Sequence, residues 1–175
     1  MKQYFLMSLL PIVFMFHDFE EIIFFKPWLR ENSVLLKTRF PKLSERILPH
    51  LEKLSTAAFS LAVAEEFILL SFITYVSIWA QSYFLWFAAF MAFSIHLIVH
   101  LIQWIILRKY IPSIVTSIFS LPYCVYTFDA FISMNVMNSF DLVIWTLIGL
   151  VIMVLNLVLA HKLALRFEKW KTTTT

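Results

Sequence analysis

Long apolar stretches separated by short polar connections run through this chain from end to end. Each stretch has the roughly 20 residues that an α-helix needs to cross the hydrocarbon core of a bilayer. The apolar stretches cover residues 3–25, 55–80, 83–107, 112–134 and 142–161. The pattern predicts an all-α integral membrane protein, a bundle of about five transmembrane helices that forms a single domain over residues 1–171.

The first connection and the end of the chain also lead to predictions. Lys26 and Pro27 are expected to end the first span, which leaves residues 26–53 as a basic loop. Within that loop, residues 42–54 place apolar side chains on one helical face and charged ones on the other, which predicts a helix lying in the headgroup region. Residues 172–175, all threonines, are expected to form a disordered tail.

The distribution of basic residues predicts the orientation of the spans. All of the 14 Lys and Arg residues except Lys2 fall on one side of the membrane if there are about five spans. Loops that face the cytoplasm carry the excess of Lys and Arg. We therefore expect the N-terminus outside and the C-terminus in the cytoplasm.

The composition agrees with a membrane protein and narrows its partners. The chain is 61% hydrophobic and 14% charged, whereas soluble domains are about 45–50% apolar and about 25% charged. Cys124 is the single cysteine, so no intramolecular disulfide is expected. Because the basic residues are accounted for by connections at the membrane, we expect the lipid bilayer as partner and no nucleic acid.

Histidines and carboxylates interrupt the apolar stretches where lipid alone favours leucine. A charged side chain near the bilayer centre costs about 2.5–3.5 kcal/mol on insertion scales, so a span accepts several only if other groups compensate for them. The interruptions are His17, Asp18, Glu20, Glu21, Glu65, Glu66, His96, His100 and Asn156. At a rise of about 1.5 Å per residue, the histidines, Glu65 and Asn156 lie roughly 8–17 Å from the cytoplasmic ends of their spans, so we expect them to meet.

Helical spacing puts these side chains on shared faces. His17, Glu20 and Glu21 are spaced i, i+3, i+4, so all three project from one face of the first span. His96 and His100 are spaced i, i+4 on the third span. Two histidines one turn apart can both hold one cation.

Imidazole nitrogens and carboxylate oxygens are ligands typical of zinc, and also of iron or manganese. The expected metal ligands are His17, His96 and His100 with one carboxylate, from Glu21 or Glu66. The remaining acids supply a catalytic base, for which Glu20 and Glu65 are the candidates, or hold a second metal. Asn156 and Gln103 are expected to orient a ligand histidine through hydrogen bonds.

The same polar residues allow other interpretations. Acids that share a low-dielectric site can be protonated or paired with histidines in a network that joins helices without metal, and they can also form an ion or proton pathway. Asp18 lies off the shared face and suits a hydrogen bond at a helix interface. Asp129 is interpreted as a separate buried polar contact, and His161 lies near the membrane surface.

The segment His17-Asp18-Phe19-Glu20-Glu21 resembles the motif that names the HXXEE family of membrane proteins. The further features that fit the family are Ala64-Glu65-Glu66, His96-x-x-x-His100, Tyr110-x-Pro112 and the late Asn156 with His161. The resemblance spans nearly the whole chain. It implies a multi-pass protein of the bacterial cytoplasmic membrane, and it names no substrate.

A looser similarity links the chain to the glutamate-type intramembrane CAAX prenyl proteases. Those proteins also place a Glu-Glu pair, separated histidines and an asparagine on membrane helices. They carry an arginine four residues after the pair, where this chain has Leu69-Leu70. The similarity concerns these residue types and their location on membrane helices, and we interpret it as analogy and not as homology.

These observations predict a membrane-embedded, metal-dependent enzyme, preferably a hydrolase that acts on a lipidic or membrane-embedded substrate with zinc. A di-iron membrane oxidoreductase is the variant within the enzyme class. A proton- or ion-coupled carrier would use the same residues, although carriers often need repeats and broken helices, and Gly149 is the chain's single glycine. A non-catalytic interaction protein is the third alternative.

Overall fold

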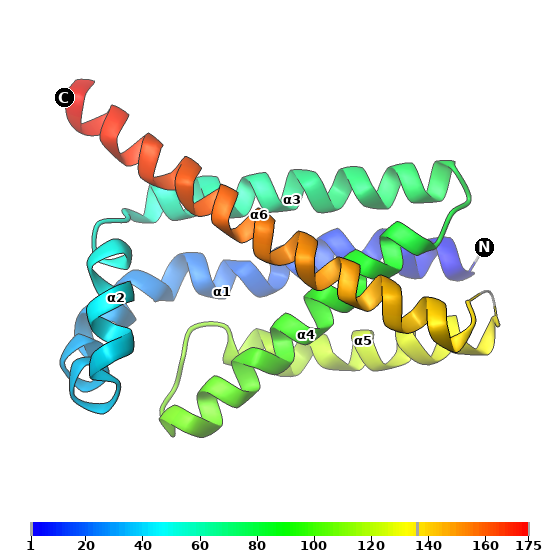
Figure 1. The fold of residues 1–175 in the computed structure, drawn as a ribbon, viewed down its shortest axis with the longest axis horizontal. Coiled ribbons are helices and arrows are strands. Elements are labelled where there is room, and N and C mark those ends of the chain that lie inside the picture. Colours follow the sequence, from blue (N-terminus) through cyan, green and yellow to red (C-terminus); the bar gives the residue numbers. More distant parts are fainter. Residues whose placement is uncertain (1, 136, 175) are drawn as a thin grey trace.

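The computed structural model describes residues 2–135 and 137–174, with the Thr174 side chain left aside. The described residues form helices and no strand, in the order α1 (Lys2–Arg39), α2 (Pro41–Leu51), α3 (Thr56–Trp79), α4 (Phe84–Leu107), α5 (Ile114–Ser133) and α6 (Ser139–Thr174). Five long helices run alongside one another, and the short α2 lies across one end (Figure 1). The all-α prediction is confirmed.

Four of the described helices are long and apolar enough to cross a membrane: Thr56–Trp79, Phe84–Leu107, Ile114–Ser133 and Ser139–Thr173. Large apolar side chains on these helices remain exposed, such as Trp79 at 86% and Phe119 at 69%. A soluble monomer rarely leaves such surfaces uncovered. Helix α1 is not among the four, because lysine, glutamine, histidine and carboxylate side chains interrupt its apolar stretch.

The prediction that Lys26 and Pro27 end the first helix is wrong, because α1 continues unbroken to Arg39. Pro27 lacks the N–H that would bond one turn back, which usually kinks or ends a helix. Contacts to distant parts of the chain hold the continuation instead. The Trp28 indole donates a hydrogen bond to the Tyr110 carbonyl at 2.7 Å, and the Lys26 ammonium binds the last carbonyls of the α2 segment.

Helix α2 (Pro41–Leu51) begins one residue before the predicted range 42–54 and ends three residues before the end of that range. Its inner face is built by Ser44 and Leu48, which are buried. Leu43 and Ile47 stay exposed, at 56% and 39%. The helix therefore packs against its own chain with one side and keeps an apolar edge free, as a helix at a membrane surface does. Its position in the headgroup region stays a prediction.

Helix α6 also extends beyond the predicted end of its span. It continues past residue 161 through the basic segment to Thr174, so residues 172–174 are helical where a disordered tail was expected, and Thr175 lies outside the described residues. The extension is held by small-residue packing and by a cap. The buried small cluster is Leu54, Ala58, Ala62, Ala160 and Ala164. Glu168 accepts hydrogen bonds from the Ser55 backbone N–H at 3.1 Å and hydroxyl at 2.6 Å, where α3 begins.

An aromatic core fixes α1 against α4 and α5. Trp86 stacks on Phe90 and Phe131, with ring centroids 5.1 Å and 4.8 Å apart, and its indole donates to the Met7 carbonyl at 3.2 Å. Met7 itself is fully buried. These aromatic side chains therefore pack between helices. The core thus holds α1 beside α4, the helix that carries His96 and His100.

Candidate metal centre

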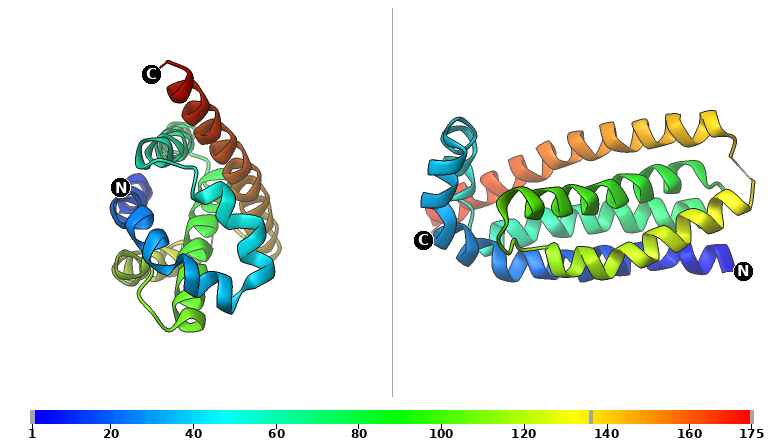
Figure 2. Two further views of the ribbon diagram at one scale, coloured as in Figure 1. Left: turned by 90° about the vertical axis from the view of Figure 1, so that its left-hand side faces the viewer. Right: turned by 90° about the horizontal axis from the view of Figure 1, so that it is seen from below.

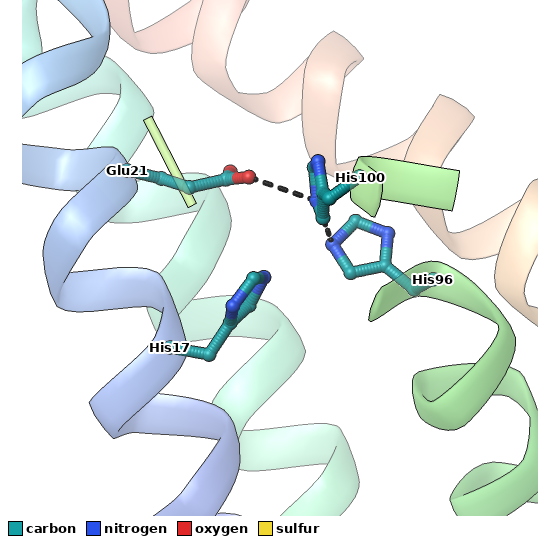
Figure 3. A group of neighbouring side chains, drawn as sticks. All are labelled: His17, Glu21, His96 and His100. Carbon is teal, nitrogen blue, oxygen red and sulfur yellow. Dashed lines mark hydrogen bonds and ion pairs between the residues drawn. The ribbon is translucent and has the colours of Figure 1, made fainter. Parts of the chain in front are cut away.

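Three histidines and one glutamate converge between α1 and α4 (Figure 3). His17 and Glu21 project from α1, and His96 and His100 project from α4. One ligand atom from each of the four residues lies within 4.8 Å of the others. Both pairs have i, i+4 spacing, so two facing helices each supply one pair. Within the part of the chain that the structure describes, this is the one group of its kind.

The closest contacts centre on His100. Its Nε2 lies 2.8 Å from His96 Nε2 and 3.1 Å from Glu21 Oε1. The His17 ring stands close to both other rings, with centroids 5.4 Å from His96 and 5.2 Å from His100. His17 is fully buried, and His100 is 8% exposed. His96 and Glu21 are partly buried, so the cluster is enclosed most completely at His17 and His100.

His17 carries the clearest sign of a missing partner. Its Nε2 is buried and has no hydrogen-bond partner. Leaving a buried polar atom unpaired costs about 1–3 kcal/mol. This nitrogen belongs to a side chain that projects from α1 toward His96 and His100 (Figure 3). A cation bound among the four residues would satisfy it, so the residues present fit a metal ion.

Hydrogen bonds from α5 fix the orientation of the His17 ring. Thr116 Oγ1 donates to Glu20 Oε2 at 2.6 Å and lies 3.3 Å from His17 Nδ1. Because the hydroxyl gives its one hydrogen to Glu20, it accepts from His17 Nδ1–H. That tautomer leaves the lone pair of His17 on Nε2, the nitrogen without a partner. Metal-binding histidines typically have their other ring nitrogen held in this way.

Glu20 therefore lies where the sequence analysis did not expect it. One of its oxygens accepts from the Thr116 backbone N–H at 2.8 Å, and the other accepts from the Tyr110 hydroxyl at 2.7 Å. Burial and this bond to Glu20 raise the pKa of Tyr110, so its hydroxyl remains a donor. Both Glu20 oxygens are thus engaged on the α5 side, where they hold Thr116, and the role of Glu20 as catalytic base stays a prediction.

Gln103 contacts His100 as its spacing predicted. His100 Nδ1 lies 3.1 Å from Gln103 Oε1. An amide oxygen only accepts, so Nδ1 donates and the lone pair of His100 lies on Nε2. That lone pair faces His96 and the carboxylate of Glu21. Several acceptor atoms then point at one another, and a shared proton or a cation is needed among them.

The other expected site residues lie beside this group. Asn156 Nδ2 donates to Glu65 Oε2 at 3.2 Å, so Asn156 contacts a glutamate where a histidine was expected. Glu66 lines the neighbouring cavity. Asp18 is 4% exposed, and its Oδ2 has no hydrogen-bond partner. It is more enclosed than Glu21 and Glu66, which are partly buried.

Two residues outside the site complete the comparison with the sequence analysis. Asp129 is exposed, so the expectation of a buried polar contact is wrong. Its position on the outward side of α5 explains the error, since depth along a helix does not give the direction of a side chain. His161 contacts the carbonyl of Leu157 on its own helix, at 2.9 Å from Nδ1. The sequence analysis missed Thr116, because a threonine in an apolar helix gives no distinguishing signal.

A cavity adjoins the cluster between α3, α4 and α6. It is open on one side, and the space within it together with the space at that opening is about 720 Å³. Its polar lining residues are Glu66, His96 and Asn156, and the rest of its lining is apolar. His96 thus belongs to both the cluster and the cavity wall. A molecule in the cavity would touch one of the four converging residues.

Comparison with known proteins places the chain in a family. No curated protein matches it. No solved structure matches it either. A family model described as "protein of unknown function with HXXEE motif" matches residues 8–127, which include all four converging residues. The chain belongs to the HXXEE-motif family, and His17, Glu20 and Glu21 supply the letters of that motif.

Proposed function

We propose that this protein is a membrane-embedded, metal-dependent enzyme, and specifically a hydrolase acting on a lipidic substrate. Zinc is the preferred metal, held by His17, Glu21, His96 and His100. The observation that carries the proposal is the convergence of four ligand atoms within 4.8 Å. The unpaired, buried Nε2 of His17 supports it independently.

The proposed chemistry follows from this set of ligands. A zinc ion held by all four residues would need a fifth position for water, which catalytic zinc sites can provide by expanding to five ligands, and it would then lower the pKa of that water toward neutrality and polarise a carbonyl group. Glu66 lines the cavity with His96 and is placed to take a proton there. Glu65 is held by Asn156 and supports that end of the cavity. Tyr110, Glu20 and Thr116 keep the His17 ring oriented.

The proposal includes a topology. We propose that α1 is a fifth span, with the N-terminus outside and the C-terminus in the cytoplasm of a bacterial cell. The end of α1, helix α2, the connection between α4 and α5, and the C-terminus all gather at the end of the bundle opposite the N-terminus (Figures 1 and 2). Nearly all basic residues belong to those segments. The positive excess therefore falls on one side.

Elemental analysis of the detergent-purified protein tests the proposed metal. We expect about one zinc, or one iron or manganese, per chain, because a site with three histidines and a carboxylate suits a single ion. The protein should be stripped with a chelator and reloaded, so that weakly bound ions are removed before counting. Protein that is metal-free as purified and takes up no added zinc would contradict the proposal.

The Thr116 contact yields a more selective prediction. Thr116→Val keeps the shape of the side chain and removes the hydroxyl that holds His17. Loss of such a partner typically costs 10–100-fold in metal affinity, so we expect zinc affinity to fall by about that factor. Competition with a chromogenic chelator measures it. Thr146→Val is the matched control, because the Thr146 hydroxyl bonds only to the Leu142 carbonyl of its own helix. Equal affinity in both variants would contradict the positioning role.

A further inference from the structure

The lining of the cavity beside the candidate metal centre indicates a class of substrate. We propose that it holds a single hydrocarbon chain of an acyl lipid, with the acyl carbonyl at His96 and the methyl end toward Ile73 and Leu85. The identity of the reaction rests on the proposed function, whereas chain binding does not. The argument uses the lining of the cavity, its direction and its surroundings.

The polar and apolar lining residues are segregated along the cavity. Glu66 on α3, His96 on α4 and Asn156 on α6 supply the polar lining. From each of them, the remaining lining residues of the same helix lie mainly toward one end of the bundle. Helix α3 is antiparallel to α4 and α6 (Figure 1). Later residues of α3 therefore lie at the same end of the bundle as earlier residues of α4 and α6. The cavity thus has a polar end and an apolar end.

The apolar part is long enough for an extended chain. On α3 it reaches from Glu66 to Ile73, and on α4 from His96 back to Leu85. At about 1.5 Å per residue these separations are roughly 10–16 Å. At the far end Ile73 on α3 is 8% exposed, whereas Leu85 on α4 is 37% exposed, so protein covers the α3 side of that end.

The chemistry of the walls selects hydrocarbon. The walls apart from the polar end offer methyl, methylene and aromatic groups, with no charged side chain. A peptide or a sugar would bury polar groups there without partners, which is costly. An acyl chain has no such groups, and the exposed apolar helix surfaces place the cavity within hydrocarbon already. Gly149 contributes backbone to the wall, at the point where α6 approaches the Ala88 backbone of α4 closely.

The reaction inferred at the polar end is hydrolysis of an acyl ester or amide. The oxygen of water bonds to the acyl carbon, and the bond from that carbon to the ester oxygen or amide nitrogen breaks. The leaving oxygen or nitrogen takes one proton from water, so the products are a fatty acid and an alcohol or amine. Glu66 is the carboxylate positioned to carry that proton. No oxidant or reductant is involved.

Photocrosslinking in vesicles of phosphatidylethanolamine and phosphatidylglycerol tests chain binding on the full chain. Two fatty acyl amide probes are used, one with a diazirine near the methyl end and one with a diazirine beside the carbonyl. We expect the methyl-end probe to label Ile73 and the carbonyl-side probe to label Ala92, one turn before His96. These side chains are 8% and 7% exposed, so surrounding lipid does not reach them. Lipid-facing Ile68, which is 66% exposed, reports the background labelling.

A filled cavity provides the control. Ala89 lines the cavity between its two ends, and Ala89→Phe should abolish labelling of Ile73 and Ala92. Ala57→Phe is the matched variant, because Ala57 is exposed and does not line the cavity; its labelling should equal that of the natural chain. Unchanged labelling of Ile68 in both variants shows that they fold and insert.

Each outcome discriminates. Labelling confined to exposed positions such as Ile68 overturns the inference. Reversed labelling, with the methyl-end probe on Ala92, also overturns it and points to oxidative chemistry on the chain instead. Metal content is measured on the same samples. Expected labelling in a protein that binds no metal supports the inference and refutes the proposed function, whereas bound metal without cavity labelling refutes the inference alone.

Discussion

Replacing His17, His96 or His100 with alanine is expected to abolish stoichiometric zinc binding. Each of these side chains supplies one of the four converging ligand atoms. With one imidazole gone, two histidines and a glutamate remain, one ligand short of the four that converge. Elemental analysis after chelation and reloading measures the loss. The expected change is from about one zinc per chain to background.

Matched controls separate loss of a ligand from general damage. His161→Ala and His50→Ala remove histidines that are exposed, and both variants should keep full zinc content. Thermal unfolding gives a second readout, since a ligand at 100 times its Kd stabilises the folded state by about 2.7 kcal/mol. Added zinc should raise the Tm of the natural chain and of the controls, and not that of the ligand variants. Ligand variants that retain zinc would contradict the assignment.

The pairing of His17 with His96 and His100 could be foreseen from the sequence, because two local rules suffice. Side chains four residues apart share a helix face, and depth follows from counting residues to the end of a span. The structure places the three rings within 5.4 Å of one another by centroids. The choice between Glu21 and Glu66 stayed open, because it depends on the rotation of α1 and α3 about their own axes.

The separate tasks of Glu20 and Glu21 show what local rules leave out. The two residues are neighbours, and neighbouring side chains on a helix point about 100° apart. Glu21 turns toward α4, and Glu20 turns toward Thr116 on α5. That rotation is fixed some distance away, where Met7 is locked into the aromatic core by the Trp86 indole. A sequence pattern does not contain this packing.

The ends of the helices were the weakest part of the sequence-based prediction. Lys26-Pro27 and the terminal threonines are local signals for the end of a helix. In the structure α1 continues through the first segment, and α6 continues to Thr174 in the second. Trp28 binds a carbonyl in the connection between α4 and α5, and Glu168 caps the start of α3. Such contacts join residues that are far apart in the sequence, so tertiary packing decides where these helices end. The apolar interiors of the later helices, whose signal is local, were predicted correctly.

Gly149→Ala is expected to destabilise the protein by about 1–3 kcal/mol, as overpacking of a closed interface usually does. A Cβ built on Gly149 would lie 2.1 Å from the Ala88 carbonyl oxygen and 2.7 Å from its carbon. Helices α4 and α6 cross closely there (Figure 1). Elsewhere in a helix this change gains roughly 0.5–1 kcal/mol, so the collision has to outweigh that gain. Thermal unfolding in detergent measures the sum, and Gly149→Leu should prevent folding altogether.

A control variant follows from which atoms of Ala88 the added methyl group would meet. The atoms that the new methyl group meets belong to the Ala88 backbone, so shortening the Ala88 side chain gives no relief. The double variant with Ala88→Gly should therefore be no more stable than Gly149→Ala alone. Val151→Ala, at a position of the same helix that is 60% exposed, should change the Tm little. Because Gly149 also lines the cavity, a neutral Gly149→Ala would mean that α4 and α6 can separate, and the cavity between them would then lack a fixed width.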